Sequence, residues 1–185
     1  MTPRSAQKIR IIGGRDRGRR LHFPDLPGLR PTPDRVRETL FNWLGQELPG
    51  RRCLDPYAGT GALSFEAVSR GAALAVAVER HRSACDALRA NAALLGGSAV
   101  EIHCADARAH LARERRSFDL VFLDPPFDED PWPWLLPACL SRLADDGRIY
   151  AEAAHVIEPV AGLETVRQDK AGQVHYHLLA RKAPG

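Results

Sequence analysis

The sequence predicts an α/β fold in which helices cover both faces of a mostly parallel sheet. From Arg52 onward, short apolar runs alternate with segments of helical periodicity, a pattern typical of repeated βαβ units. The apolar runs end in acidic or glycine-rich stretches, which is where doubly wound sheets bind their ligands. The chain of 185 residues, 44% hydrophobic and 26% charged, has the size and composition of one compact globular domain.

Within that one unit we expect a basic N-terminal extension, residues 1–45, packed on a body formed by residues 46–185. Two short strand-like runs, residues 8–13 and 19–23, are separated by the glycine- and arginine-rich sequence GRDRG. Strand-like runs joined by such a turn predict a β-hairpin at the start of the extension.

A helix should follow the hairpin after a proline-rich passage, residues 24–33. We expect Thr32 to be its N-cap, Pro33 to lie in its first turn and Gly45 to end it. Its apolar side chains recur at helical spacing and should face the body; they are Val36, Leu40, Trp43 and Leu44.

The body is expected to alternate strands and helices. Strands should end at Asp55, Glu79, Cys104 and Leu123, and helices should begin near Gly61, His81 and Asp106. Residues 147–152 predict a fifth strand, and the last forty residues predict a closing hairpin with its turn at residues 169–172.

The charge is uneven along the chain. The first 52 residues carry 12 Lys and Arg against 5 Asp and Glu, whereas the remaining residues carry 14 against 18. A basic extension on a mildly acidic body fits a protein that meets phosphates with one part and does its chemistry with another. A solvated hairpin without a partner fits the same charges equally well.

Several classes of protein are disfavoured by what the sequence lacks. No run approaches about 20 apolar residues, and the basic N-terminus lacks the apolar core of a signal peptide, so we expect a cytoplasmic protein without a membrane span.

His175 and His177 share one face of a predicted strand, but no third ligand is in sight, so we expect no metal site. The cysteines form no CxxC pair, which favours reduced and mostly buried thiols; they are Cys53, Cys85, Cys104 and Cys139.

The first strand of the body is followed by DPYAGTG, in which Asp55 precedes Gly59 and Gly61. Glycines at such a turn let the backbone approach a ligand closely. Ser64 stands where a dinucleotide fingerprint has a third glycine, and a carboxylate beside a pyrophosphate would be repelled. Asp55 would instead attract the cationic sulfonium or ammonium of S-adenosylmethionine, which we expect as the cofactor.

Two further acids follow the next two strands. Glu79 comes 24 residues after Asp55, near the offset at which an acid binds ribose hydroxyls, unless it is an ordinary exposed glutamate. Asp106 is placed either to accept from an adenine amino group or to cap the following helix. Three acids at three successive strand ends indicate a nucleoside pocket.

The fourth strand ends in DPPF, residues 124–127. Two prolines directly after a buried strand make the turn rigid and fix the Asp124 carboxylate and the Pro125 carbonyl as acceptors for a planar amine. Phe127 offers a face on which a flipped base can stack. The alternative is a proline-punctuated loop whose phenylalanine plugs the core.

Together these motifs resemble a known enzyme family. DPYAGTGALSFEA (residues 55–67) and DPPF, in this order and about seventy residues apart, are similar to motifs I and IV of the class I amino-methyltransferases. IRIIGGRDRGRRL, LRPTPDRVRETLFNWL (residues 29–44) and AGQVHYHLL (residues 171–179) resemble the bacterial 16S ribosomal RNA guanine-N2 methyltransferase family. That family acts on the guanine conventionally numbered 966, and the resemblance covers nearly the whole chain.

The resemblance implies a Rossmann-like class I methyltransferase fold with a seven-stranded sheet and S-adenosylmethionine as cofactor. Cofactor contacts would come from Asp55, Tyr57, Ala58, Gly59, Thr60, Gly61, Glu79, Arg80, Asp106, Ala107 and Asp124. The target guanine would be held by Asp124, Pro125, Pro126 and Phe127. RNA would be bound by Arg15, Arg17, Arg19, Arg20, Arg30, Arg35 and Arg37. The partner would be 16S ribosomal RNA within a small-subunit assembly intermediate, bound by a monomer.

The expected reaction is an in-line displacement in which guanine N2 attacks the methyl group, so the protein positions its partners and needs neither a metal nor a covalent nucleophile. Three alternatives stay open. A DNA amino-methyltransferase would usually carry a large recognition domain, and a protein or small-molecule N-methyltransferase would not need the basic extension. A noncatalytic RNA-binding relative would not need Asp55, Glu79 and Asp124 intact. Trp132 and Trp134 either wall the target pocket or belong to the core or the surface.

Overall fold

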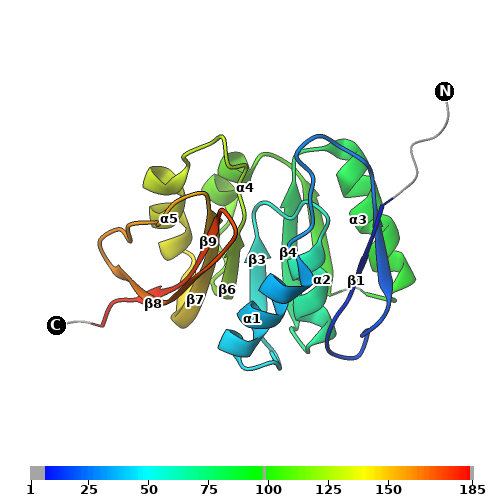
Figure 1. The fold of residues 1–185 in the computed structure, drawn as a ribbon, viewed down its shortest axis with the longest axis horizontal. Coiled ribbons are helices and arrows are strands. Elements are labelled where there is room, and N and C mark those ends of the chain that lie inside the picture. The colour runs from blue at the N-terminus through cyan, green and yellow to red at the C-terminus, as the bar shows by residue number, and fades with distance from the viewer. Residues whose placement is uncertain (1–6, 98, 184–185) are drawn as a thin grey trace.

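A computed structural model describes residues 7–97 and 99–183. Its centre is a seven-stranded sheet in the order β5-β4-β3-β6-β7-β9-β8 (Figure 1). The first five strands in that order are parallel, and β9 runs in the opposite direction to the other six strands. The strands are β3 (Arg52–Asp55), β4 (Leu74–Glu79), β5 (Val100–Cys104), β6 (Phe118–Leu123), β7 (Leu143–Ala153), β8 (Leu163–Ala171) and β9 (Val174–Arg181). The predicted α/β fold with a mostly parallel sheet is confirmed.

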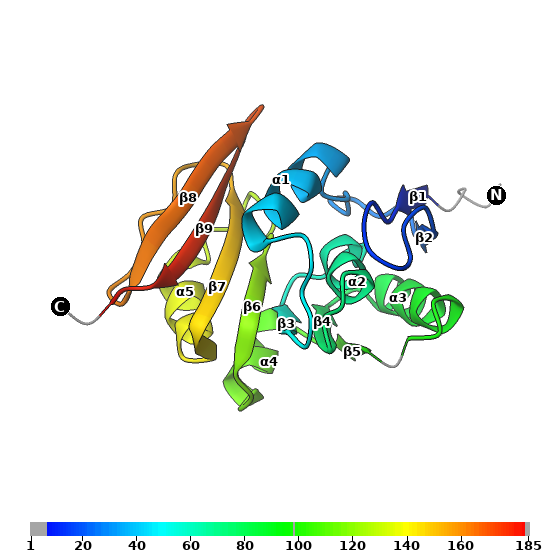
Figure 2. The same cartoon turned by 90° about the horizontal axis from the view of Figure 1, so that it is seen from below.

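Helices cover both faces of the sheet, as Figure 2 shows. One face carries α1 (Asp34–Leu44), α2 (Ala62–Ser69) and α3 (Arg82–Leu94), and the other carries α4 (Ala107–Arg113) and α5 (Trp132–Leu140). The four predicted strand ends and the three predicted helix starts agree with these bounds to within one residue.

Alternation along the strands divides the apolar side chains between two cores. On β6, Phe122 packs with α1 and α2 whereas Leu123 packs with α5 on the opposite face, since successive side chains of a strand point in opposite directions. Because both faces of the sheet are covered, the central strands β4 and β6 are apolar along most of their length.

The N-terminal hairpin consists of β1 (Gln7–Arg10) and β2 (Arg20–Phe23), paired antiparallel as predicted. Its apolar residues Leu21 and Phe23 join the same core as α1, α2 and α3. Asn91 of α3 fixes β2, because its side chain accepts from the backbone N–H of His22 at 3.0 Å and donates to the carbonyl of His22 at 2.8 Å.

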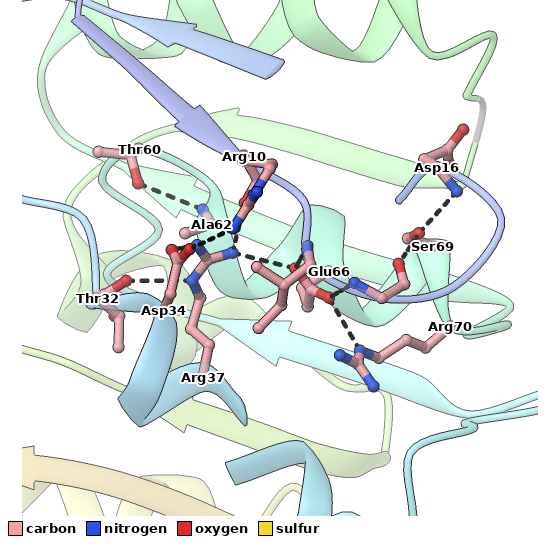
Figure 3. A network of polar contacts seen from close by, with 12 residues as sticks. Arg10, Asp16, Thr32, Asp34, Arg37, Thr60, Ala62, Glu66, Ser69 and Arg70 are labelled. Atoms are coloured by element: carbon pink, nitrogen blue, oxygen red, sulfur yellow. Dashed lines mark hydrogen bonds and ion pairs between the residues drawn. The ribbon is translucent and has the colours of Figure 1, made fainter. Parts of the chain in front are cut away.

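A buried ion-pair network fastens the extension to α2 (Figure 3). The Glu66 carboxylate accepts from the Nη1 of Arg37 at 3.1 Å and from the Nε of Arg70 at 3.0 Å. It also accepts from the backbone N–H groups of Ile12 and Gly13, at 3.0 and 2.7 Å. One side chain of α2 therefore holds the hairpin, α1 and the end of its own helix together.

Three sequence-based expectations need correction. The N-cap of α1 is Pro33, with no side-chain cap, because Thr32 lies one residue before the cap position and is buried. The fifth strand begins at Leu143 rather than residue 147, since Leu143 already pairs with Phe118. The closing hairpin turns at residues 172–173 and not at 169–172, because Ala171 still pairs with Val174.

Candidate active site

The sheet reverses its connection order between β3 and β6. From β3 the chain proceeds to β4 and β5 on one side, and from β6 it proceeds to β7 on the other. Ligands of open α/β sheets bind outside the carboxyl ends of the strands at such a point. Four acids lie there in the spatial order β4, β3, β6, β7; they are Glu79, Asp55, Asp124 and Glu152.

All four acids project from the same face of the sheet, the face that carries α1 and α2. Leu54, Val78, Leu123 and Ala151, the residues that directly precede them, all belong to the opposite core. The acids therefore form one line across the carboxyl edge, and we call them the acid row.

Asp55, the last residue of β3, is almost completely buried. Burial raises the pKa of its carboxyl to about 7, a shift opposed by a hydrogen bond from the Ser64 hydroxyl to Oδ2 at 2.8 Å. Ser64 is the residue that stands in place of a third fingerprint glycine, so the departure from the dinucleotide motif supplies a partner for Asp55. A buried carboxyl of this kind is well placed for a cationic ligand group.

The loop after Asp55 is anchored on β4. The backbone N–H of Ala58 donates to the carbonyl of Val78 at 2.9 Å, and that of Gly61 donates to the carbonyl of Ala58 at 2.7 Å. Gly61 has a φ of 79°, and a Cβ there would lie 2.5 Å from the Cδ2 of Leu88. Both the left-handed backbone and the close approach of α3 require glycine at this position.

Glu79 is 8% exposed and supports the glycine loop directly. Its Oε2 accepts from the backbone N–H of Gly59 at 3.1 Å and its Oε1 accepts from that of His81 at 2.7 Å. The alternative of an ordinary exposed glutamate is therefore excluded. The next residue, Arg80, forms an ion pair with Glu129 at 3.5 Å, which links the loop after β4 to the loop after β6.

Asp106 caps α4, because its Oδ1 accepts from the backbone N–H of Ala109 at 2.9 Å. The helix-capping alternative is thus what the structure shows. A carboxylate accepts several hydrogen bonds, so capping leaves room for an adenine amino group at the same side chain.

The DPPF loop continues from β6 along the acid row. Burial raises the pKa of Asp124 well above its usual range, and the nearby Glu152 and Asp55 carboxylates raise it further. Pro125 is buried and Pro126 is half-buried, whereas Phe127 is 50% exposed. Phe127 does not plug the core, and its ring is accessible to a ligand.

Glu152, near the end of β7, is the acid that the sequence analysis missed. It is 5% exposed, and its Oε1 accepts from the hydroxyl of Tyr150 at 2.7 Å. Burial raises the pKa of its carboxyl, and hydrogen bonds from Tyr150 and Thr32 oppose that shift. The signal was present in the sequence, because Glu152 is an acid at the end of the fifth predicted strand, as Asp55 and Glu79 are at the ends of earlier ones.

Arg37 is wrongly assigned to RNA binding. Its side chain is 0% exposed, and its guanidinium donates to Glu66, to Asp34 and to the carbonyls of Thr32 and Arg10. A guanidinium enclosed in this way has no face left for a phosphate.

The six other predicted arginines are exposed, but they lie at two places. The hairpin loop that bears Arg15, Arg17 and Arg19 lies against the end of α2, where the N–H of Arg15 donates to the carbonyl of Ser69 at 2.8 Å. α2 has eight residues, so that end lies about 12 Å along the helix from the glycine loop. The segment with Arg30 lies beside the glycine loop, because a Cβ on Gly59 would be 3.2 Å from the Cδ1 of Leu29.

Trp132, Trp134 and His177 lie on the opposite face of the sheet from the acid row. Trp132 is buried in the core on the α4 and α5 face, and Trp134 packs against that core with the Arg108 guanidinium 5.1 Å from its ring centre. His177 is buried, with its Nε2 accepting from the N–H of Ile157 at 3.2 Å. Among residues 7–97 and 99–183 no cluster of three or more potential metal ligands occurs.

The whole arrangement can be compared with known proteins. A family model described as conserved hypothetical protein 95 matches residues 9–180. The chain belongs to this family. Its matched region contains the acid row, the glycine loop, the DPPF loop and most of the basic extension. None of the helices in the described part of the chain is both long and apolar enough to span a membrane.

Individual proteins similar to this chain agree with its assignment to the conserved hypothetical protein 95 family. Ribosomal RNA small subunit methyltransferase D of Escherichia coli (strain K12) is 43% identical, across 96% of this chain and 92% of that protein. The protein of the same name from Buchnera aphidicola subsp. Baizongia pistaciae is 31% identical, across 92% and 90%. The solved structure of Escherichia coli yhhF has a TM-score of 0.86 and 40% identity, covering 96% of this chain and all of that one.

Proposed function

We propose that this protein transfers a methyl group from S-adenosylmethionine to the exocyclic N2 amine of a guanine in small-subunit (16S) ribosomal RNA. The observation that carries the proposal is 43% identity to a small-subunit ribosomal RNA methyltransferase over 96% of the chain. The acid row supports it, since carboxylates at the switch point can accept from a target amine and attract a cationic cofactor. The sequence resemblance further suggests the guanine conventionally numbered 966.

The residues around Asp55 fit S-adenosylmethionine. When bound, this cofactor supplies an electrophilic methyl group on a cationic sulfonium. Asp55 and the glycine loop would hold its methionine part, because a buried carboxyl with a raised pKa gains most from a cation. Glu79 would bind the ribose and Asp106 the adenine. The neighbouring backbone of these loops would complete the pocket; its residues are Tyr57, Ala58, Thr60, Arg80 and Ala107.

The DPPF loop fits the target amine. The Asp124 carboxylate and the Pro125 carbonyl would accept the two hydrogens of N2, which favours a pyramidal nitrogen and aims its lone pair at the methyl group. Phe127, half exposed on the same loop, would stack on the flipped base. The chain's own contribution is positioning, and the methylated ammonium loses its proton readily to water.

The basic extension supports an RNA substrate over a protein or a small molecule. Its exposed arginines lie on both the hairpin loop and the segment beside the glycine loop, so a long polyanion could contact both. We propose a cytoplasmic monomer acting on a small-subunit assembly intermediate, in which bound proteins shape the RNA.

A tritiated-methyl transfer assay tests the proposal. Unmodified small-subunit RNA, particles that contain it, double-stranded DNA and bulk protein are each offered with labelled S-adenosylmethionine. The expected product is N2-methylguanosine in RNA, identified by nucleoside analysis. Label in DNA, protein or another nucleoside would overturn the proposal, and cofactor binding without any transfer would favour a noncatalytic relative.

A further inference from the structure

Glu152 lies next to Asp124 but has no part in the reaction as described so far. In the parallel pairing of β6 with β7, Leu123 is opposite Ala151, so the residues that follow them are neighbours on the same face. Adjacent parallel strands are about 4.8 Å apart, so side chains that follow two such strands on the same face can converge on one base. The two carboxyl groups are therefore neighbours at the end of the acid row.

The Glu152 carboxylate is held in place by Tyr150, two residues earlier on β7, whose hydroxyl donates to Oε1 at 2.7 Å. Thr32, in the segment before α1, also lowers the pKa of Glu152. The donating hydroxyl of Tyr150 fixes the Glu152 carboxyl group and opposes the rise in its pKa that burial causes, so Glu152 is a preorganised acceptor. A carboxylate that is 95% buried is costly unless each of its oxygens is used.

The chemistry of the bases gives this second acceptor a use. Guanine presents its N2 amine beside the N1–H, so two donors lie side by side. Adenine and cytosine present an amine beside a bare ring nitrogen, which is an acceptor and would face the carboxylate unfavourably. A pair of adjacent acceptors thus matches guanine and rejects the other amino-bearing bases.

We infer that Glu152 selects guanine by accepting its N1–H while Asp124 accepts from the N2 amine. The inference rests on the proposed function and deepens it, since it names the group that distinguishes one base from another. Asp55 and Glu79 at the other end of the row remain with the cofactor. Tyr150 and Thr32 are positioning residues that act through Glu152.

The test uses two RNA substrates that differ only at the target base, guanine in one and 2-aminopurine in the other. 2-Aminopurine keeps the 2-amine but has no N1–H. The parent enzyme should prefer guanine in kcat/KM by a hundredfold or more, because a site built to bind a donor discriminates strongly against its absence. In Glu152→Gln the preference should fall at least tenfold, since the amide can donate to the bare N1 and accepts from guanine more weakly.

Two further variants keep the test interpretable. Glu164→Gln, an exposed glutamate on β8, is the matched control and should leave the base preference unchanged. Tyr150→Phe removes only the hydroxyl that holds Glu152 and should reduce the preference by a smaller factor; it carries the test if Glu152→Gln does not fold. Calorimetric titration with S-adenosylmethionine should give parental affinity for all three.

The possible failures are distinguishable. A parent protein that methylates no guanine in any RNA overturns the proposed function and this inference with it. A parent active on guanine, together with an unchanged preference in Glu152→Gln and Tyr150→Phe, overturns the inference alone. A selective loss of preference without loss of cofactor affinity supports it.

Discussion

Glu66→Ala should destabilise the fold through the two arginines that it leaves behind. The carboxylate is 0% exposed and accepts four hydrogen bonds, two from guanidinium groups and two from backbone N–H groups of the hairpin loop. Arg37 is itself 0% exposed, so the variant would contain a buried cation with only Asp34 as an acidic partner. Removing one member of a buried pair costs about 3 to 5 kcal/mol, because the other charge is left without compensation.

Thermal and urea unfolding followed by circular dichroism would measure the effect. For a chain of this size each kcal/mol lowers the melting temperature by about 2 to 4 °C, so the expected decrease is roughly 6 to 20 °C. Glu66→Gln keeps the shape and one acceptor oxygen and should lose less. Glu164→Ala, on the exposed surface of β8, should change the free energy of unfolding by less than about 0.5 kcal/mol. A loss below about 1 kcal/mol in Glu66→Ala would refute the view that this network fastens the extension to the body.

Three further outcomes are expected. Because burial raises the pKa of Asp55 to about 7, Asp55 binds a proton at lower pH, and a cationic cofactor must displace that proton. Calorimetry should therefore show a constant Kd for S-adenosylmethionine above about pH 8. Below about pH 6 the Kd should rise by up to tenfold per pH unit. Asp55→Asn should bind weakly with no such dependence, and equal pH profiles would exclude Asp55 as the titrating group. Asp124→Ala should lower turnover about a hundredfold or more with cofactor affinity nearly intact, and parental turnover in this variant would make the DPPF loop purely structural. Phe127→Ala should weaken RNA binding by about 1 to 3 kcal/mol. Replacing Arg15, Arg17, Arg19 and Arg20 with glutamine should flatten the salt dependence of RNA binding by up to about three units of slope, and parallel slopes would return the hairpin loop to a solvated surface.

The strand ends of the body could be predicted because two independent signals coincide at each of them. An apolar run stops where the strand leaves the core, and a polar or glycine residue follows where the sheet edge meets solvent or ligand. Asp55 and Leu123 satisfy both signals and were placed to the residue. The hairpin turn near Gly172 was placed less well, since polar residues at an exposed sheet edge resemble those of a turn, and only pairing with β9 shows that Ala171 is still a strand residue.

Arg35 and Arg37 show what composition cannot reveal. Two residues apart on the same helix, they have the same side chain and were given the same role, yet Arg35 is exposed and Arg37 is completely buried. The difference lies in Glu66, 29 residues further along, whose position on α2 faces Arg37 only when both helices pack on one side of the sheet. Thr32 also departs from its expected role, because it is buried by residues distant in the sequence and Pro33 takes the N-cap position.

The acid row also depends on sheet order rather than chain order. Along the sequence the acids occur as Asp55, Glu79, Asp124 and Glu152, but in space Glu79 precedes Asp55 because β4 lies on the far side of β3. The reversal at β3 and β6 therefore divides the four acids into two pairs. Glu79 and Asp55 lie by the glycine loop, and Asp124 and Glu152 lie by the DPPF loop. A methyl donor held by the first pair and a base held by the second would meet at the switch point, between Asp55 and Asp124. The same topology that makes a ligand crevice thus gives each half of the reaction its own two carboxylates, which is why Glu152 is expected to act on the base and not on the cofactor.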